Sequence, residues 1–525
     1  MVNTYTSKVG NLYLEGEIMS IQIKTAAFSG VEGILINVEV DITYGLPNFN
    51  IVGLGDTAVK ESKDRVRSAI TNSSLDFPIS RITINLAPAH IRKEGSHYDL
   101  PIAVGILLAT NQLFLEEPDN FIFMGELSLN GNVNKIKGAL PIVIEGIKHG
   151  VKNYIVPMEN KDECACIEEA NIYPIKNLSE VIHLFTYKDV KPYTFTNREK
   201  YKNNNCPLDF EDVIGQQAAK RALEVAVAGN HNVLMYGTPG SGKTMLAERV
   251  ISIMPPLTDE EALEVTKIYS ISGELKEEGL MGNRPFRNPH HTITSTALIG
   301  GGRNPSAGEV SLAHNGVLFL DEILEFDKRA LQVLRQPLEN KRVRISRVNG
   351  TITYPADFML VAAMNPCNCG MYGSETRLCK CSDSEVKRYL SRLSGPLLER
   401  IDIFTPVNSI SYETINNDKK EEKSEVMALR IERAREIQSE RFRNEHIKYN
   451  SNMSSSHIKK YCMLNENSNR ILEYTYKKYG LSTRVYNRIL KVARTIADLD
   501  GNKSIEENHI IEALQYRKYI REDII

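Results

Sequence analysis

The sequence predicts a multidomain α/β protein whose central domain is built on a parallel sheet. The chain has 525 residues, too many for one hydrophobic core, so several domains are expected. Two short apolar runs, Val233–Tyr236 and Val317–Leu320, have the length and composition of buried parallel strands. A glycine-rich loop and a helical pattern follow the first run, and the second ends in Asp321-Glu322. This order is typical of an open sheet that binds its ligand where the strands end.

Composition narrows the class of protein. Hydrophobic residues make up 42% and charged residues 25% of the chain, as in ordinary globular proteins. The net charge is −2, so any contact with DNA must come from a local basic patch. No run approaches the roughly 18 apolar residues of a membrane span, and residues 1–20 lack a secretion signal. We therefore expect a cytoplasmic protein without membrane contact, in which the eight cysteines are free or bind metal.

The N-terminal third is expected to be an α+β domain. Residues 1–18 are polar without clear periodicity and are predicted to be an extension. The domain itself is assigned to residues 19–190, with strands over 33–40 and 81–86 and helices over 56–70 and 100–108. Strands and helices mixed in this way can form one layered domain with its own core.

A linker, the central domain and a helical segment make up the remainder. Residues 191–207 are polar and include three consecutive asparagines, which favours a linker. The α/β core is assigned to 208–410. Residues 411–525 read as helical, and the charge run over 416–423 is expected to be solvated.

The glycine-rich loop has the full G-x-x-x-x-G-K-[ST] pattern of a phosphate-binding loop. Its backbone N–H groups and the following helix N-terminus favour phosphate oxygens. The predicted nucleotide-binding residues are Gly237, Thr238, Pro239, Gly240, Ser241, Gly242, Lys243 and Thr244. Lys243 is expected to reach the β- and γ-phosphates and Thr244 to ligate Mg²⁺, so the predicted cofactors are ATP and Mg²⁺. Asp321 would hold the metal through water, and Glu322 would orient the attacking water.

Several stretches resemble the ComM/YifB family of magnesium-chelatase-like AAA+ ATPases. In the first domain they are 45–47, 51–54, 56–62, 125–131 and 156–160, and in the core residues 284–322. The resemblance implies a Lon-protease-like N-terminal domain, an AAA+ P-loop NTPase core and a C-terminal helical lid. It also implies a hexameric motor that drives branch migration of DNA, single-stranded or branched, during natural transformation.

Protease activity is not expected from the Lon-like domain. Lon-type proteases use a Ser–Lys dyad in which the lysine activates the serine. The pattern places His97 at the serine position and Leu140 at the lysine position. Ser96 and Lys137 lie nearby in sequence, so a shifted dyad stays open as an alternative.

The resemblance assigns further roles residue by residue. Asn365 matches the sensor asparagine that helps to position the attacking water. Arg400 matches the arginine finger that a neighbouring subunit supplies, with Arg392 as the alternative. Arg484, in Leu481-Ser482-Thr483-Arg484, matches the lid arginine that touches nucleotide.

A basic hairpin is the candidate DNA-binding element. Residues 341–354 read as two strands joined at Asn349-Gly350. Alternation puts Arg342, Arg344 and Ser346 on one face, and Arg347 is the third basic candidate. A basic hairpin in a ring pore would suit a phosphate backbone, although a solvated charged face is the alternative.

Two groups of residues are considered as metal sites. Cys367, Cys369, Cys379 and Cys381 form two Cys-x-Cys pairs that could supply four thiolates to Zn²⁺, with free thiols or a redox pair as alternatives. His290 and His291 lack a third ligand at a recognisable spacing, so a structural role in a loop is expected.

Three functions follow from these observations. The first is a Mg²⁺-dependent ATPase acting as a ring-shaped DNA motor. The second is a chelatase-type or protein-remodelling motor subunit, and the third, disfavoured by the missing dyad, is an ATP-dependent protease.

Overall fold

The computed structural model describes residues 20–187, 190–195, 206–276, 279–302, 306–347, 350–373, 377–415 and 420–517. The predicted extension over 1–18 lies outside the described residues, as does most of the predicted linker. The chain divides into two compact units. The N-terminal unit comprises Met1–Thr196 and Tyr269–Leu280, and the C-terminal unit comprises Asn197–Ile268 and Met281–Ile525.

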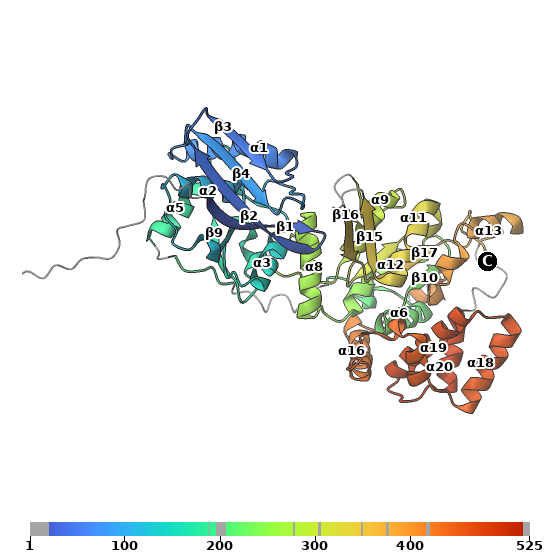
Figure 1. The fold of residues 1–525 in the computed structure, drawn as a ribbon. Helices are drawn as coiled ribbons and strands as arrows, with labels where there is room; N and C mark the ends of the chain where they lie inside the picture. The colour runs from blue at the N-terminus through green and yellow to red at the C-terminus, as the bar shows by residue number, and fades with distance from the viewer. Residues whose placement is uncertain are drawn as a thin grey trace, which may run out of the picture. The chain divides into compact units, whose positions relative to one another are not determined.

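A seven-stranded mixed sheet forms the core of the N-terminal unit, with strand order β3-β4-β2-β1-β5-β8-β9 (Figure 1). β1 and β2 pair antiparallel, as do β2 and β4, whereas β5, β8 and β9 run parallel. The strands are β1 Ile21–Ser29, β2 Glu32–Thr43, β3 Asn48–Val52, β4 Arg81–Ala87, β5 Phe121–Phe123, β8 Asn153–Pro157 and β9 Asn171–Ile175. The predicted α+β character and the strands expected over 33–40 and 81–86 are therefore present.

Helices α1, α2 and α3 pack against this sheet because each buries an apolar face. α1 (Thr57–Asn72) begins at Asp56, whose carboxylate accepts a hydrogen bond from the Val59 N–H at 2.9 Å. α2 (Asp99–Ala109) is buried along nearly its whole length, and α3 (Ala139–Lys148) contacts β1 and β2. α4 (Lys161–Cys164) and α5 (Leu178–Tyr187) complete the helices of this unit, and β6 (Glu126–Leu127) pairs with β7 (Val133–Asn134).

The first residues of the predicted linker belong to this unit. Tyr193 forms a bridge with Ile172 of β9, donating its N–H to the Ile172 carbonyl at 2.7 Å. The Tyr193 hydroxyl also donates to Asp162 at 2.7 Å, and Phe195 is buried. The polar composition of 191–207 therefore did not predict the short paired segment at its start.

A five-stranded parallel sheet forms the centre of the C-terminal unit, with strand order β11-β14-β17-β10-β18. The strands are β10 Val233–Tyr236, β11 Phe286–Arg287, β14 Val317–Leu320, β17 Met359–Met364 and β18 Ile403–Pro406. β14 and β17 are buried at every residue, which explains their continuous apolar sequence. The predicted parallel sheet is confirmed.

Short helices and two hairpins surround this sheet. They are α6 Gln217–Gly229, α7 Lys243–Arg249, α8 Asp259–Ser272, α9 Ser295–Ile299, α10 Glu309–Leu312, α11 Lys328–Val333, α12 Arg335–Asn340, α13 Asp383–Leu390, α14 Gly395–Leu398 and α15 Tyr412–Ile415. The hairpins are β12 (Gly300–Gly301) with β13 (Ser306–Ala307), and β15 (Arg342–Arg347) with β16 (Gly350–Pro355).

The C-terminal helices share one hydrophobic core with the parallel sheet. α16 (Ser424–Arg441) and α19 (Thr483–Leu499) both pack on α6. A single cluster of buried residues runs from Val233 and Val361 of the sheet to Ile431 and Ile496 of these helices. α17 (Ser455–Tyr461), α18 (Glu466–Tyr479) and α20 (Glu507–Gln515) complete the bundle (Figure 1).

Helix α8 ends in the N-terminal unit, although it starts in the other one. The Ser270 carbonyl accepts a hydrogen bond at 3.0 Å from the N–H of Gly138, the residue before α3. Gly273 packs against the side chain of Lys137, so that a Cβ there would lie 2.6 Å from Lys137 Cε. The N-terminal unit is thus built from two separate stretches of chain.

Among the described residues, none of the helices combines the length and the apolar character that crossing a membrane requires.

Candidate functional site

The phosphate-binding loop connects β10 to α7. Gly240 and Gly242 adopt left-handed backbone angles, with φ of 78° and 94°, which glycine allows at little cost. Gly237 has no room for a side chain, because a Cβ there would lie 2.0 Å from the Val407 carbonyl oxygen. These three glycines let the loop turn tightly between strand and helix, as a phosphate-binding turn requires.

Lys243 is the first residue of α7 and turns its ammonium back toward the loop. Its Nζ donates to the carbonyls of Gly237 at 2.8 Å and Thr238 at 2.9 Å, and to Asn365 Oδ1 at 3.2 Å. Burial lowers the pKa of Lys243, and the nearby carboxylates of Asp321 and Glu322 oppose that shift. The ammonium therefore lies inside the loop, where phosphate oxygens can replace the carbonyls as its partners.

The two residues predicted to serve Mg²⁺ are in direct contact. The Thr244 hydroxyl donates to Asp321 Oδ2 at 2.8 Å, and the backbone N–H of Glu322 donates to Asp321 Oδ1 at 2.9 Å. Glu322 itself has a left-handed φ of 49° and an exposed side chain. A hydroxyl and a carboxylate in this arrangement are oxygen ligands of the kind that Mg²⁺ takes in proteins, so the donor set fits the expected ion.

Parallel strand pairing explains why these residues meet. Tyr236 of β10 lies opposite Met364 of β17, and Leu320 of β14 lies opposite Ala362. The three strands therefore end at one edge of the sheet, and the residues that follow them converge there. The structure brings together Lys243, Thr244, Asp321 and Asn365 as the sequence predicted, while their chemical roles remain proposals.

Residues outside the predicted motifs also contact, or lie beside, the phosphate-binding loop. Gln216, with a left-handed φ of 57°, donates its side-chain amide to the carbonyls of Ser241 at 3.2 Å and Asn408 at 2.6 Å. The hydroxyls of Thr238 and Ser409 lie 3.0 Å apart. Gln216 lies near the start of the assigned core, and the sequence pattern did not predict its contacts with Ser241 and Asn408.

The charge run over 416–423 is not fully solvated. Glu421 pairs with Lys220 at 2.7 Å and accepts the Gly215 N–H at 2.6 Å, with 13% of its side chain exposed. These bonds lower the pKa of Glu421 against the opposing effect of burial, which is the largest single influence on it. The solvated loop that we expected is thus wrong at Glu421, which ties the chain to α6, while residues 416–419 lie outside the described residues.

The three arginines assigned from the family resemblance bind carboxylates in their own chain. Arg400 donates to Glu339 at 2.5 Å, Arg392 to Glu325 at 3.1 Å and Arg484 to Glu399 at 3.1 Å. Arg400 also donates to the Pro396 carbonyl at 2.6 Å, while its Nε is buried without a hydrogen-bond partner among the described residues. The structure therefore does not place these guanidinium groups on the phosphate-binding loop of the same chain.

The basic hairpin has the predicted alternation. Arg342, Arg344 and Ser346 are exposed, whereas Val343 and Ile345 are buried. Arg347 pairs with Gly350 in the ladder, so Gly350 belongs to β16 rather than to the turn. The side chain of Arg347 and residues 348–349, where the predicted turn falls, lie outside the described residues.

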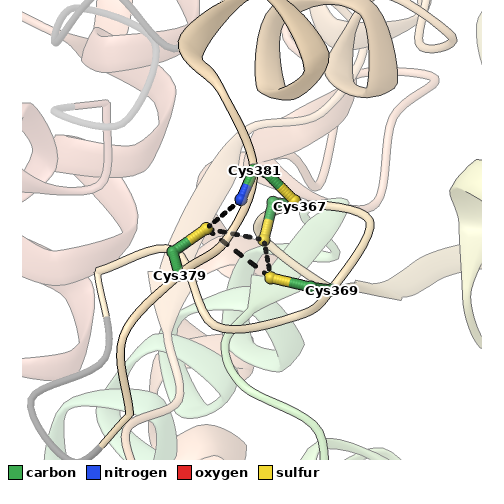
Figure 2. A group of neighbouring side chains, drawn as sticks. All are labelled: Cys367, Cys369, Cys379 and Cys381. Carbon is green, nitrogen blue, oxygen red and sulfur yellow. Dashed lines mark hydrogen bonds between the residues drawn. The ribbon is translucent and has the colours of Figure 1, made fainter.

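The four cysteines of the two Cys-x-Cys pairs form one cluster (Figure 2). Their sulfur atoms all lie within 4.8 Å of one another. Cys367 Sγ is 3.4 Å from Cys369 Sγ and 3.7 Å from Cys379 Sγ, and the last two sulfurs are 3.5 Å apart. Among the described residues this is the one group of three or more such side chains close enough to share an ion. His290 and His291 instead stack on each other, with ring centroids 4.0 Å apart.

The positions considered for a Lon-type dyad have other partners. The Ser96 hydroxyl donates to the Glu126 carboxylate, and the buried His97 ring contacts the Ala26 carbonyl at 3.0 Å. Leu140 is buried in α3, and Lys137 is exposed. The shifted Ser96–Lys137 dyad is not formed in the structure.

Comparisons with known proteins agree with the geometry of the core. Residues 209–415 match the family model described as magnesium chelatase, subunit ChlI. Residues 38–160 match the model of subunit ChlI of Mg-chelatase, and residues 421–517 match that of the ChlI C-terminal region. No comparison bears on the Lon-like assignment of the first domain, which stays a prediction.

Some relatives match nearly the whole chain, and others match only part of it. Competence protein ComM of Haemophilus influenzae is 42% identical over 506 residues, which are 95% of this chain and 97% of the relative. Protein YifB of Escherichia coli is 43% identical over 510 residues, again 95% of this chain and 97% of the relative. The magnesium-chelatase 67 kDa subunit of Chlorobaculum tepidum is 29% identical over 206 residues, 38% of this chain and 27% of that protein.

Proposed function

The chain belongs to the ComM/YifB family of magnesium-chelatase-like AAA+ proteins, and from this we propose that it is a Mg²⁺-dependent ATPase that works as a ring-shaped DNA motor. The proposed process is branch migration while incoming DNA is recombined during natural transformation. The name of the Haemophilus relative, a competence protein, supports this process.

The contact between Thr244 and Asp321, beside Lys243, carries the ATPase part of the proposal. Lys243 would hold the negative charge of the β- and γ-phosphates, and its present carbonyl partners mark where these oxygens would bind. Bound Mg²⁺ would neutralise charge that develops between these phosphates. The exposed Glu322 carboxylate would orient the attacking water and accept its proton, and Asn365 would help to position that water.

The hairpin of β15 and β16 supports the DNA part of the proposal. Arg342 and Arg344 project from one face, while the other face is anchored by buried Val343 and Ile345. The net charge of −2 gives no general affinity for nucleic acid, so a local pair of guanidinium groups is what a phosphate backbone would contact.

Assembly into a homo-oligomer, which we propose to be a hexamer, would complete each ATP site. Arg400 lies in a segment that is anchored from several sides. Its carbonyl accepts a bond from the Asn232 side chain at 2.9 Å, and Asn232 directly precedes β10. A segment anchored through its backbone in this way would present the Arg400 guanidinium to the nucleotide of a neighbouring subunit, where it would stabilise the charge on the γ-phosphate.

A chelatase-type or protein-remodelling motor is the second candidate. The match of three separate segments to models of subunit ChlI favours it. Proteolysis is the least favoured, because Ser96 and Lys137 do not form a dyad.

Measurement of ATP hydrolysis with and without DNA separates these candidates. The rate of the purified full-length protein would be compared without DNA, with single-stranded DNA and with a branched junction, using Glu322→Gln as the blank. We expect Mg²⁺-dependent hydrolysis that DNA stimulates by about tenfold or more. Hydrolysis indifferent to every DNA would favour the second candidate, and absence of hydrolysis would overturn the proposal.

A further inference from the structure

The cysteine cluster has the dimensions of a tetrahedral metal site. A Zn²⁺ ion bound by four thiolates at about 2.3 Å requires sulfur–sulfur separations of about 3.8 Å. The three separations between Cys367, Cys369 and Cys379 are 3.4, 3.7 and 3.5 Å, close to that value. They are far longer than the roughly 2.05 Å bond of a disulfide. The fourth sulfur, on Cys381, lies within 4.8 Å of the others.

Backbone N–H groups point at the sulfur atoms. The Tyr372 N–H donates to Cys367 Sγ at 3.3 Å, and the Cys381 N–H donates to Cys379 Sγ at 3.4 Å. The second of these bonds is drawn in Figure 2. Donors aimed at sulfur stabilise the thiolate form, which is the form that binds metal. Outer donors of this kind also hold metal ligands in a fixed orientation.

The cluster closes a loop that starts after β17, a strand of the proposed ATP site, and ends at helix α13. Cys367 follows Asn365 by two residues, directly after β17. Cys381 directly precedes Ser382, the cap residue that begins α13 with a capping box completed by Glu385. A metal bound here would therefore join the end of a central strand to the start of a helix.

The same loop lies against the phosphate-binding loop. Gly370, which directly follows Cys369, has a left-handed φ of 78°. A Cβ at Gly370 would lie 2.6 Å from both Cγ and Cδ of Pro239. Its N–H donates to the Cys367 carbonyl at 2.9 Å, so the position of this contact depends directly on the backbone of a cysteine in the cluster.

We propose that Cys367, Cys369, Cys379 and Cys381 bind one structural Zn²⁺ ion, and that this ion holds Gly370 against Pro239 and thereby keeps the phosphate-binding loop ready for nucleotide. Four soft thiolates in a closed tetrahedral set are the ligands of a structural zinc site. The coupling to nucleotide rests on the ATP binding proposed above, whereas the metal site itself does not depend on it.

Metal content tests the site directly. The full-length protein, purified without chelator, would be analysed by inductively coupled plasma mass spectrometry. We expect about one Zn²⁺ per chain, and a decrease of at least about fivefold in Cys379→Ser, because three ligands bind this ion far more weakly than four. Cys206→Ser, which changes a cysteine outside the cluster, is the matched control and should keep its zinc. Iron in place of zinc, or no metal at all, would overturn the site.

Nucleotide affinity tests the coupling without removing a ligand. Gly370→Ala should keep its zinc but bind a fluorescent ATP analogue with Mg²⁺ at least about fivefold more weakly, because the added Cβ overlaps the Pro239 ring. Wild-type protein stripped of zinc by a chelator should show a loss in the same direction, reversed when Zn²⁺ is restored. Circular dichroism would confirm that each sample stays folded.

The possible failures can be told apart. Equal nucleotide affinity in wild type, Gly370→Ala and stripped protein would overturn the coupling while leaving the zinc site. If the wild-type chain contains zinc but binds no nucleotide, both the proposed function and the coupling would be overturned. The zinc site itself would still stand.

Discussion

His97 is a residue at which burial decides the charge. Its imidazole is buried and donates from Nε2 to the carbonyl of Ala26 in β1, 3.0 Å away. Burial lowers its pKa from 6.5 to about 4, although the Ala26 hydrogen bond and the Asp56 carboxylate act in the opposite direction. The folded chain thus holds His97 neutral at a pH where an unfolded chain would protonate it.

We expect the N-terminal unit to lose stability on acidification for this reason. Because the pKa of His97 is lower in the folded state, its contribution to the free energy of unfolding is fully present above pH 6.5. That contribution is lost as the pH falls toward 4. The full loss is about 3 kcal/mol for this one residue. Hydrogen exchange of amides in β1 and α2 of the full chain, compared at each pH with His97→Gln, would measure it. Glutamine can still donate to Ala26, so equal pH dependence in both proteins would contradict the prediction.

The proposed ATP site shows which contacts could be predicted from the sequence and which could not. Lys243, Thr244 and Asp321 could be expected to meet, because parallel strands deliver the residues after them to one edge. Gln216 and Asn408 could not, because their contacts depend on loop paths that no periodicity records. Glu421 was misjudged because a run of charge suggests solvent, and only the folded position of Lys220 shows that its carboxylate has a buried partner.

The helices and strands were predicted well from the hydrophobic pattern where burial along the element is regular. β14, apolar throughout, and α1, with a cap at Asp56, lie where the sequence placed them. Arg342–Arg347 forms a strand with the expected alternation, yet its register puts Gly350 within the partner strand. Short elements such as Tyr193 opposite Ile172 have too few residues to show a pattern, so their pairing is visible only in the structure.

The hairpin of β15 and β16 should carry much of the response to DNA. Replacement of both Arg342 and Arg344 by glutamate should lower DNA-stimulated ATP hydrolysis about tenfold or more and leave the rate without DNA unchanged. The reason is that two guanidinium groups that attract phosphates become carboxylates that repel them. The dependence of DNA affinity on salt should also weaken, by about 0.7 in the log–log slope for each phosphate of a single strand that the protein no longer neutralises.

Arg470→Glu is the control for a change of charge away from the hairpin, and it shifts the net charge half as much as the two hairpin changes together. Arg470 lies on α18 with 76% of its side chain exposed, so its replacement alters net charge without touching the hairpin. Equal losses in Arg470→Glu and in the hairpin variant would show a general effect of charge and would contradict a role for the hairpin.

At the scale of the whole molecule, the proposed ring predicts that two inactive variants restore each other. Arg400→Ala should reduce ATP hydrolysis by about a thousandfold or more, as loss of an arginine finger does. Its partner Glu339 is 59% exposed, so the carboxylate left behind would be hydrated, and the stability of the variant is checked separately because the Arg400 side chain is only 13% exposed. Mixed with Glu322→Gln, it should regain activity, because some interfaces then combine an intact Glu322 with an intact Arg400.

Arg392→Ala serves as the comparison for this experiment, since Arg392 is the other candidate for the same role. Hydrolysis would be measured over a range of mixing ratios, with nucleotide binding checked for each variant alone. Mixtures that stay inactive at every ratio would contradict a contribution from the neighbouring subunit, and a larger loss in Arg392→Ala would move the role to that residue.

The return of residues 269–280 to the N-terminal unit has a consequence for synthesis on the ribosome. Domains generally fold in the order in which they emerge from the ribosome. Here, however, the Gly138 N–H cannot form its hydrogen bond to the Ser270 carbonyl until residue 270 has been synthesised. The first unit is therefore completed only after β10, the phosphate-binding loop and α7 have been translated. A nascent chain halted near residue 200 would present an unfinished surface beside α3, and a gene fragment that starts at residue 208 would encode the missing piece without its partner.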